Sequence, residues 1–345
     1  MNGRTGIRCS WSRKGIFSMK IKHRALMIAM VLAWMLSGLI CGTLADGQTT
    51  DTVLMVRPVA FGFNAETAVN NAFQQEGSED NIPELARKES DAYIELLEAC
   101  GIHVIAVEDT LEPHTPDSVF PNNWFSTHED GTLVMYPMFA ENRRLERKPA
   151  VLEAIKENFN IQKTVDLTHY EEDGLFLEGT GSMVLDRENK IAYACRSPRT
   201  NETVLEDFCR QLGYSPVLFN AVDANGKQIY HTNVLMHVGS EIAVVCMESI
   251  TDPKERSTVR ESLEKTGKTI VEITFDQMSH FAGNMLEVHN HKGEPCLIMS
   301  LTAYNSLSEE QIRFLESRMK LITPFLSCIE ENGGGSARCM IAEIY

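Results

Sequence analysis

A cysteine six residues before the last residue of this 345-residue sequence stands in a setting that suits a nucleophile. Cys339 follows three consecutive glycines at 333–335, which let a backbone approach a ligand closely. Arg338 beside it is a cation that could favour the reactive thiolate. A flexible tail with an incidental cysteine is the alternative, but residues 340–345 (MIAEIY) are typical of a strand. We therefore predict that Cys339 is a catalytic nucleophile.

Two further side chains supply the other groups that such chemistry needs. His231, in the segment YHTNVLMHV, can protonate a leaving amine and then take a proton from water. Glu178, in FLEGTGS, can bind the N–H groups of a planar substrate through charge-assisted hydrogen bonds. A satisfied core histidine and an exposed turn glutamate are the alternatives. The positions of both residues in an internal repeat, described below, favour catalysis.

Substrate-binding groups are expected from one arginine and several amides. Arg199, in CRSPRTN, could clamp a substrate carboxylate with two parallel hydrogen bonds, with a surface arginine as the alternative. The amides predicted to bind substrate are Asn122, Asn123, Asn233 and Asn284. His280 is a weaker catalytic candidate, and the histidines expected at the surface are His128, His237, His289 and His291.

The cysteines give no sign of a metal or redox site. No C-x-x-C pair occurs, so a zinc or thioredoxin-type site is unsupported, and we expect neither a metal nor a cofactor. Cys195, Cys246 and Cys296 lie in apolar runs, where a small buried side chain is the expected role.

Four stretches of the chain resemble one another and define a repeat. They are residues 121–137, 177–198, 230–249 and 281–300. Each opens with small or polar residues and continues as an apolar run, a polar turn and a second apolar run, which is the pattern of a β-hairpin. The turns into the first run, at Asn123, Gly181, Asn233 and Asn284, are 58, 52 and 51 residues apart, and a further step of 55 residues reaches Cys339.

Helical patterns lie between these hairpins. Residues 83–100, 200–213 and 308–323 carry helical periodicity with capping signals. The unit is therefore ββαβ and the fold class α/β. Pairing of a strand at 52–59 with the strand after Cys339 would close a five-bladed α/β propeller, whereas an ordinary α/β sandwich is the alternative. In a closed ring, equivalent positions converge on one axis, so the cysteine, histidine, glutamate and amides would meet.

The first 45 residues differ from the rest. They contain seven basic and no acidic residues, an apolar run at 25–41, and small residues before position 46. This is the layout of a secretion signal, with Met19 as a possible true start. We predict a signal peptide at 1–45, a single catalytic domain at 46–345, and export to the periplasm or the extracellular space. A retained anchor through residues 25–41 and a buried helix are the alternatives.

The charge of the predicted mature chain limits its partners. Without residues 1–45, 25 basic residues face 48 acidic ones, a net charge of −23. Such a surface repels nucleic acid and anionic lipid. It is compatible with a small cationic or zwitterionic substrate, although acidic charge most often serves solubility. We expect a small-molecule substrate and no nucleic acid, with a homo-oligomer and a monomer as the alternatives for assembly.

Several motifs, taken together and in order, resemble the guanidino-group modifying superfamily, which has the pentein fold. They are FPNNWFSTH, LEGTGSMVLD, SPRTN, YHTNVLMHV, FAGNMLEV and GGGSARCM. The superfamily includes arginine deiminase, dimethylarginine dimethylaminohydrolase, succinylarginine dihydrolase and glycine amidinotransferase. The similarity covers about residues 52–345 and is greatest to amidinotransferase-type hydrolases proposed for citrulline utilisation.

The resemblance implies a role for each of four residues. It places the nucleophile on Cys339, the acid/base on His231, the guanidino-binding carboxylate on Glu178 and a substrate-carboxylate site on Arg199. The implied reaction passes through a tetrahedral adduct and a covalent thiouronium- or thiocarbamate-like intermediate, which water releases without a metal.

Two departures from the arginine deiminase pattern bear on the substrate. Asn233 stands where deiminases carry an aspartate two residues after the histidine, and Asn122 and Asn123 stand where their motif has an aspartate. A buried cationic guanidinium with too few carboxylates is costly, whereas an amide both donates and accepts and suits a neutral ureido group. We therefore expect hydrolysis of citrulline to ornithine, carbon dioxide and ammonia. An arginine deiminase or dihydrolase, an amidinotransferase and a non-catalytic pentein binding module are the alternatives.

Overall fold

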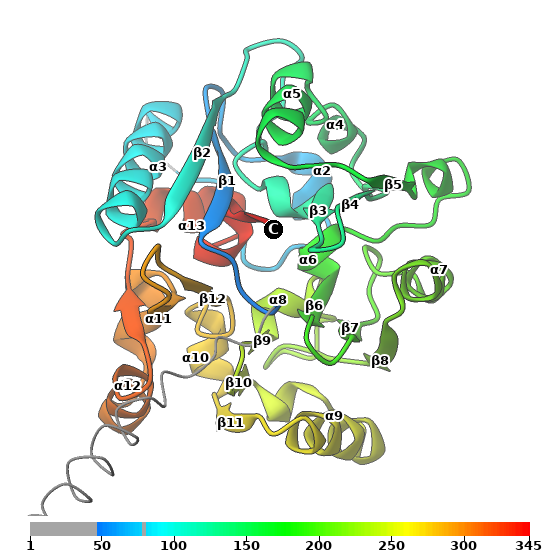
Figure 1. Ribbon diagram of the computed structural model, residues 1–345, viewed down its shortest axis with the longest axis vertical. Coiled ribbons are helices and arrows are strands. Elements are labelled where there is room, and N and C mark those ends of the chain that lie inside the picture. Colours follow the sequence, from blue (N-terminus) through cyan, green and yellow to red (C-terminus); the bar gives the residue numbers. More distant parts are fainter. Residues whose placement is uncertain (1–46, 78–80) are drawn as a thin grey trace, which may run out of the picture. The chain divides into compact units, whose positions relative to one another are not determined.

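The computed structural model describes residues 47–77 and 81–345 (Figure 1). The predicted signal peptide, the alternative start at Met19 and the possible anchor at 25–41 lie outside the described residues. The boundary between residues 45 and 46, and with it export, therefore stays a prediction. Within the described ranges, no helix is both long enough and apolar enough to span a membrane.

Fifteen strands in the described ranges form five separate three-stranded sheets that share one topology. In each, a central strand pairs antiparallel with one neighbour and parallel with the other. In order across each sheet, the strands are β15 (Ala342–Ile344), β1 (Thr52–Arg57) and β2 (His103–Glu108); β3 (Phe125–Thr127), β4 (Thr132–Met135) and β5 (Lys163–Asp166); β6 (Met183–Asp186), β7 (Ile191–Cys195) and β8 (Ser215–Phe219); β9 (Met236–Val238), β10 (Ile242–Val245) and β11 (Thr269–Glu272); and β12 (Leu286–His289), β13 (Pro295–Ile298) and β14 (Lys320–Ile322).

The class and the repeating unit predicted from sequence are observed. The fold is α/β, built from small mixed sheets, and hairpins occur in the four stretches identified as repeats. β1 pairs antiparallel with β15, with Thr52 opposite Ile344, so the strand after Cys339 pairs with the first strand, as expected. No single sheet closes on itself among the described strands.

The central strands of the sheets are buried and consist mainly of apolar residues. β10 (IAVV) is buried throughout, as are four of the five residues of β7 (IAYAC). Strands covered on both faces carry such continuous apolar runs. Cys195, Cys246 and Cys296 are fully buried in or beside these strands, in agreement with their expected role.

Helices follow the second strand of each unit and appear towards the outside of the ribbon in Figure 1. The predicted helices at 83–100 and 200–213 correspond to α3 (Ile82–Ala99) and α7 (Glu202–Leu212), the latter capped by the Asn201 side chain. Further helices are α2 (Ala65–Ala68), α4 (Glu141–Arg144), α5 (Pro149–Asn158), α9 (Pro253–Lys265), α10 (Phe275–Ser279), α11 (Leu301–Ser306), α12 (Glu309–Glu316) and α13 (Ser327–Gly333), and two 3-10 turns are η2 (Thr168–Glu171) and η3 (Met247–Ser249).

The prediction of one helix over 308–323 was wrong in its second half. α12 begins with the expected capping box of Ser308 and Gln311 but ends at Glu316. Residues 320–322 then form β14, which pairs parallel with β13. Apolar residues close to the end of a helical pattern can serve a short strand equally well, and here pairing with β13 decides the outcome.

Candidate active site

A short helical turn precedes four of the five strands that pair antiparallel with a central strand, and these turns carry most of the predicted chemical groups. They are η1 (Pro121–Asn123), α6 (Gly179–Ser182), α8 (Thr232–Leu235) and η4 (Ala337–Met340), and α6 contacts both η1 and α8 while η1 contacts η4. Gly179 has φ +45°, and a Cβ there would lie 2.5 Å from the Asn122 carbonyl oxygen. Glycine at this position therefore allows α6 to pack against the backbone of η1.

The thiol of Cys339 is buried and contacts two amides. Cys339 is 4% exposed, and its Sγ accepts hydrogen bonds from Asn284 Nδ2 at 3.3 Å and Asn233 Nδ2 at 3.6 Å. The glycine run serves packing, because a Cβ at Gly335 would lie 2.9 Å from the Phe120 ring. The guanidinium of Arg338 donates to Glu343 and to the Ile341 carbonyl oxygen, so the cation expected beside the thiol is paired elsewhere.

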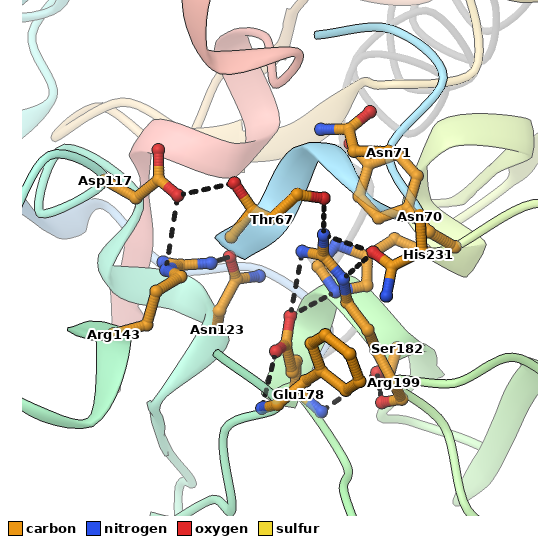
Figure 2. A network of polar contacts seen from close by, with 12 residues as sticks. Thr67, Asn70, Asn71, Asp117, Asn123, Arg143, Glu178, Ser182, Arg199 and His231 are labelled. Carbon is orange, nitrogen blue, oxygen red and sulfur yellow. Dashed lines mark hydrogen bonds and ion pairs between the residues drawn. The ribbon is translucent and has the colours of Figure 1, made fainter. Parts of the chain in front are cut away.

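His231 and Glu178, which are the N-cap residues of α8 and α6, form a buried pair (Figure 2). His231 Nε2 lies 2.8 Å from Glu178 Oε2, and both residues are at most 2% exposed. Burial lowers the pKa of His231 to about 4, although Glu178 opposes the shift. At neutral pH the ring is therefore neutral, and because a carboxylate only accepts, Nε2 carries the proton and Nδ1 is the free base.

The groups around Glu178 stabilise the ionised form of its carboxyl group. Burial acts to raise its pKa, but Arg199, the hydrogen bond from His231 and the charge on Arg143 outweigh burial and lower the pKa below its ordinary value. Its other oxygen, Oε1, accepts from the Phe139 backbone N–H at 3.0 Å. The alternative of an exposed turn glutamate is thus excluded, since the residue has no exposed surface.

Two residues that the sequence analysis missed complete the polar lining. Arg143 donates to Asn123 Oδ1 at 2.8 Å and to Glu146, and it lies 3.9 Å from Asp117 (Figure 2). Burial raises the pKa of Asp117, with Arg143 opposing, and Asp117 Oδ1 has no hydrogen-bond partner. The position of Asp117 four residues before the PNN turn could have indicated it, whereas nothing local singles out Arg143 among its neighbouring arginines.

Arg199 reaches the site, but its donors are occupied. Its Nε and Nη2 donate to Asn70 Oδ1, Nη2 also donates to the Thr67 carbonyl oxygen at 2.8 Å, and Nη1 lies 3.4 Å from Glu178 Oε2 (Figure 2). Arg199 is 2% exposed, so the surface alternative is excluded. The α2 segment that supplies these acceptors was not identified from sequence as part of the site.

The predicted amides take three different positions. Asn123 lines the cavity described next, and its Nδ2 has no hydrogen-bond partner. Asn233 and Asn284 contact the thiol. Asn122 is not among the residues that line the cavity, and its Nδ2 lies 3.2 Å from Thr180 Oγ1, so it joins η1 to α6.

One cavity collects most of these groups. Its lining includes Asp117, Asn123, Arg143, Arg199, His231 and Cys339. The lining combines a thiol, a neutral imidazole, one carboxylate and two guanidinium groups, which suits a small zwitterion. Among the residues that the structure describes, no group of histidine, cysteine and acidic side chains is arranged to hold a metal ion.

The expectation that four other histidines lie at the surface was wrong for two of them. His128 and His237 are 3% and 4% exposed, and burial lowers the pKa of His237 to about 3. His291 is exposed, His289 is half-buried, and His280 is an exposed side chain that does not line the cavity. His128 directly follows β3 and His237 lies in β9, and every residue of these two strands is buried, so no alternation with exposed residues marks the histidines as buried.

The chain matches one model of a protein family. Residues 57–345 match a family model described as N,N dimethylarginine dimethylhydrolase, eukaryotic. A search of curated proteins found no match. The family match and the similar solved structures described next confirm the expected membership of the pentein superfamily.

Solved structures share the fold at low sequence identity. The N-terminal domain of ArgZ, an arginine dihydrolase from cyanobacteria, solved bound to substrate, is 18% identical with a TM-score of 0.67, covering 85% of this chain and 97% of that domain. Full-length ArgZ is similar over only 40% of its length, so the present chain spans less than half of that protein. DDAH from Pseudomonas aeruginosa, complexed with citrulline, is 16% identical with a TM-score of 0.59, covering 86% of this chain and all of that one. Because the family model covers nearly the whole described chain, this protein belongs to the N,N dimethylarginine dimethylhydrolase family.

Proposed function

We propose that this protein is a hydrolase that attacks the planar carbon of a ureido or guanidino group through Cys339. The observation that carries the proposal is that the Cys339 thiol and the His231 ring, itself bonded to buried Glu178, line one small cavity. A nucleophile, a base and a group that orients the base are the parts of covalent catalysis. Membership of a family of guanidino-group hydrolases supports the same reaction class.

The protonation state of His231 suits both halves of such a reaction. Its free Nδ1 can accept the thiol proton as sulfur attacks the carbon, and Glu178 stabilises the imidazolium that results. The imidazolium then protonates the leaving nitrogen, which departs as the tetrahedral adduct collapses to an S-linked intermediate. Neutral again, His231 takes a proton from water, which attacks the intermediate and frees the sulfur.

Further charged groups that line the cavity fit the amino-acid end of a substrate. Asp117 Oδ1, buried and unpaired, is placed to accept from an ammonium group. Arg199 is the proposed carboxylate site, and a substrate carboxylate would take the place of Asn70 Oδ1, which now accepts from both Nε and Nη2.

Citrulline is our preferred substrate because of the orientation of Asn123. Arg143 donates to Asn123 Oδ1, so the amide nitrogen, which has no partner, is the end left for a ligand. A donor at this point suits the carbonyl oxygen of a ureido group better than a cationic guanidinium. The expected products are ornithine, carbon dioxide and ammonia. Arginine or methylated arginine is the second candidate, favoured by the name of the matching family and by the likeness to ArgZ.

We also propose that the five sheets are blades around a common axis. The shared topology of the sheets and the β1–β15 pairing support this arrangement. It accounts for the convergence of four turns that are far apart in sequence.

A substrate panel with purified protein tests the proposed reaction. We expect ammonia and ornithine from citrulline, and none from the Cys339→Ala variant, whose fold is checked by circular dichroism. Ammonia from arginine with citrulline as the accumulating product would instead establish a deiminase. Full turnover by Cys339→Ala would refute the mechanism.

A further inference from the structure

The thiol of Cys339 rests against two amide side chains from neighbouring units and not against a cation. Asn284, in the turn before β12, donates from Nδ2 to Sγ at 3.3 Å, and Asn233, in α8, approaches Sγ at 3.6 Å. Both asparagines are 1% exposed. Arg338, the neighbouring cation, is paired with Glu343.

The orientation of the Asn284 amide is set by the backbone at both ends. Its Oδ1 accepts from the Arg338 backbone N–H at 3.0 Å, and its Nδ2 donates to the Asn233 carbonyl oxygen at 3.0 Å. A backbone N–H can only donate and a carbonyl can only accept, so the amide cannot be turned around without losing both bonds. The second proton on Nδ2 therefore faces the sulfur.

Asn233 differs in this respect. Its Oδ1 is buried and has no hydrogen-bond partner, so no bond of its own prevents a half-turn of the amide. With the nitrogen towards sulfur it donates to a thiolate, and with the oxygen towards sulfur it accepts from a thiol. Only Asn284 is obliged to donate in either state of the thiol.

We infer that Asn284 is a positioning residue that holds Cys339 with its sulfur as an acceptor and so favours the thiolate form. The inference rests on the proposed role of Cys339 as nucleophile. A fixed N–H on one side of the sulfur stabilises the negative charge and leaves the thiol proton to point away from Asn284. The remaining titratable groups around the thiol are Tyr93, Tyr230, His231, Asp117 and the guanidinium groups of Arg143 and Arg199.

Two substitutions separate this role from mere packing. Asn284→Asp keeps an oxygen for the Arg338 N–H but puts a second oxygen, without a proton, beside the sulfur. Asn284→Ala removes the donor without adding charge. Asn290→Asp is the matched control, because Asn290 is also buried and lies at the far end of β12, where it bonds Glu294.

Alkylation of Cys339 by iodoacetamide, followed by mass spectrometry of its peptide, measures the thiolate without using turnover. At about pH 7 we expect both Asn284 variants to react about tenfold more slowly than wild type, since a hydrogen bond to a charged group is worth about that factor. At about pH 10, where most thiols are ionised, the rates should converge. Asn290→Asp should match wild type at both pH values. Thiolate absorbance, taken as a difference from Cys339→Ala, gives the same comparison without a reagent entering the cavity.

Equal alkylation rates at neutral pH would overturn the inference, and so would an equal loss of rate at both pH values, which would indicate a structural effect. The alkylation rates and the turnover of Cys339→Ala test the role of Asn284 and the role of Cys339 separately. Turnover by Cys339→Ala would remove Cys339 from the reaction whatever the alkylation rates, whereas an inactive Cys339→Ala with unchanged rates in the Asn284 variants would remove only the role of Asn284.

Discussion

At the scale of single residues, hydrogen bonds within the protein decide which atom of each polar side chain is left for a substrate. Glu178 accepts from His231, which leaves Nδ1 of the ring as the base. Arg143 occupies the oxygen of Asn123, which leaves that amide to act as a donor. Buried polar groups must be satisfied, so these internal bonds decide what remains for a substrate.

Asn123→Asp tests the link between the amide and the substrate. One carboxylate oxygen can keep the bond to Arg143, while the other replaces the donor by an anion. We expect the ratio of kcat/KM for arginine to that for citrulline to rise at least about tenfold, because charge-assisted hydrogen bonds are roughly twice as strong as neutral ones. Asn225→Asp, in an exposed turn, adds the same charge away from the site and should leave the ratio unchanged. An unchanged ratio in Asn123→Asp would contradict the preference for citrulline.

The buried His237 makes a prediction about pH. Its pKa of about 3 lies below the ordinary value of 6.5 because burial disfavours the charged ring. Between these values the unfolded chain binds the proton and the folded chain does not, so this contribution to stability is lost as pH falls below about 6.5. His237→Gln cannot titrate, so the stability advantage of wild type over the variant should shrink by about 1.4 kcal/mol per pH unit below that point. Urea unfolding at several pH values measures the difference, and a pH-independent difference would contradict the prediction.

At the scale of elements, the short turns before the strands position the site, and their glycines set how closely they pack. A Cβ on Gly181 in α6 would lie 2.4 Å from Asn123 Nδ2 and 2.7 Å from His231 Nδ1. Both contacts are far inside van der Waals distance, so a side chain here must displace the Asn123 amide, the His231 ring or the turns that carry them.

Gly181→Ala is therefore expected to lower kcat about 100-fold with the fold retained, since a displacement of about 1 Å in an active site has that effect. Gly62→Ala is the matched control, because a Cβ there meets nothing within 4 Å and its φ is not in the left-handed region. Steady-state kinetics and circular dichroism compare the two. Near-normal kcat in Gly181→Ala would show that the turns can separate without cost.

At the scale of the whole molecule, the last strand is held by more than its pairing with β1. Glu343 in β15 is 8% exposed and pairs with Arg338 at 2.7 Å and with Arg187, which follows β6, at 3.4 Å. Burial acts to raise the pKa of Glu343, but the two arginines outweigh it and lower the pKa. This carboxylate thus joins the last strand to a separate sheet.

Glu343→Gln should lower the free energy of unfolding by about 3 kcal/mol, because removal of one partner leaves buried charges uncompensated. Glu309→Gln is the control. Its partner Arg313 and Glu309 itself are mostly exposed, so its loss should cost less than about 0.5 kcal/mol. Urea denaturation measures both. Similar small losses in the two variants would show that the buried network contributes little.

The sequence by itself determined the repeating unit, the pairing of the first and last strands and the convergence of Cys339, His231 and Glu178. Alternation of apolar and polar residues specifies strands and turns locally, and equal spacing carries equivalent turns to equivalent places. The end of α12 was misjudged because the same apolar residues serve helix and strand.

Only the tertiary structure decided which partner each polar group takes. Arg338 pairs with Glu343 and not with its neighbour Cys339, Arg199 bonds Asn70, and Asn284 holds the thiol. Arg143 enters the site, and His128 and His237 are buried, without any local signal. The physical reason is that burial and hydrogen bonding are settled between segments far apart in the chain, where the pattern around one residue carries no information about the other.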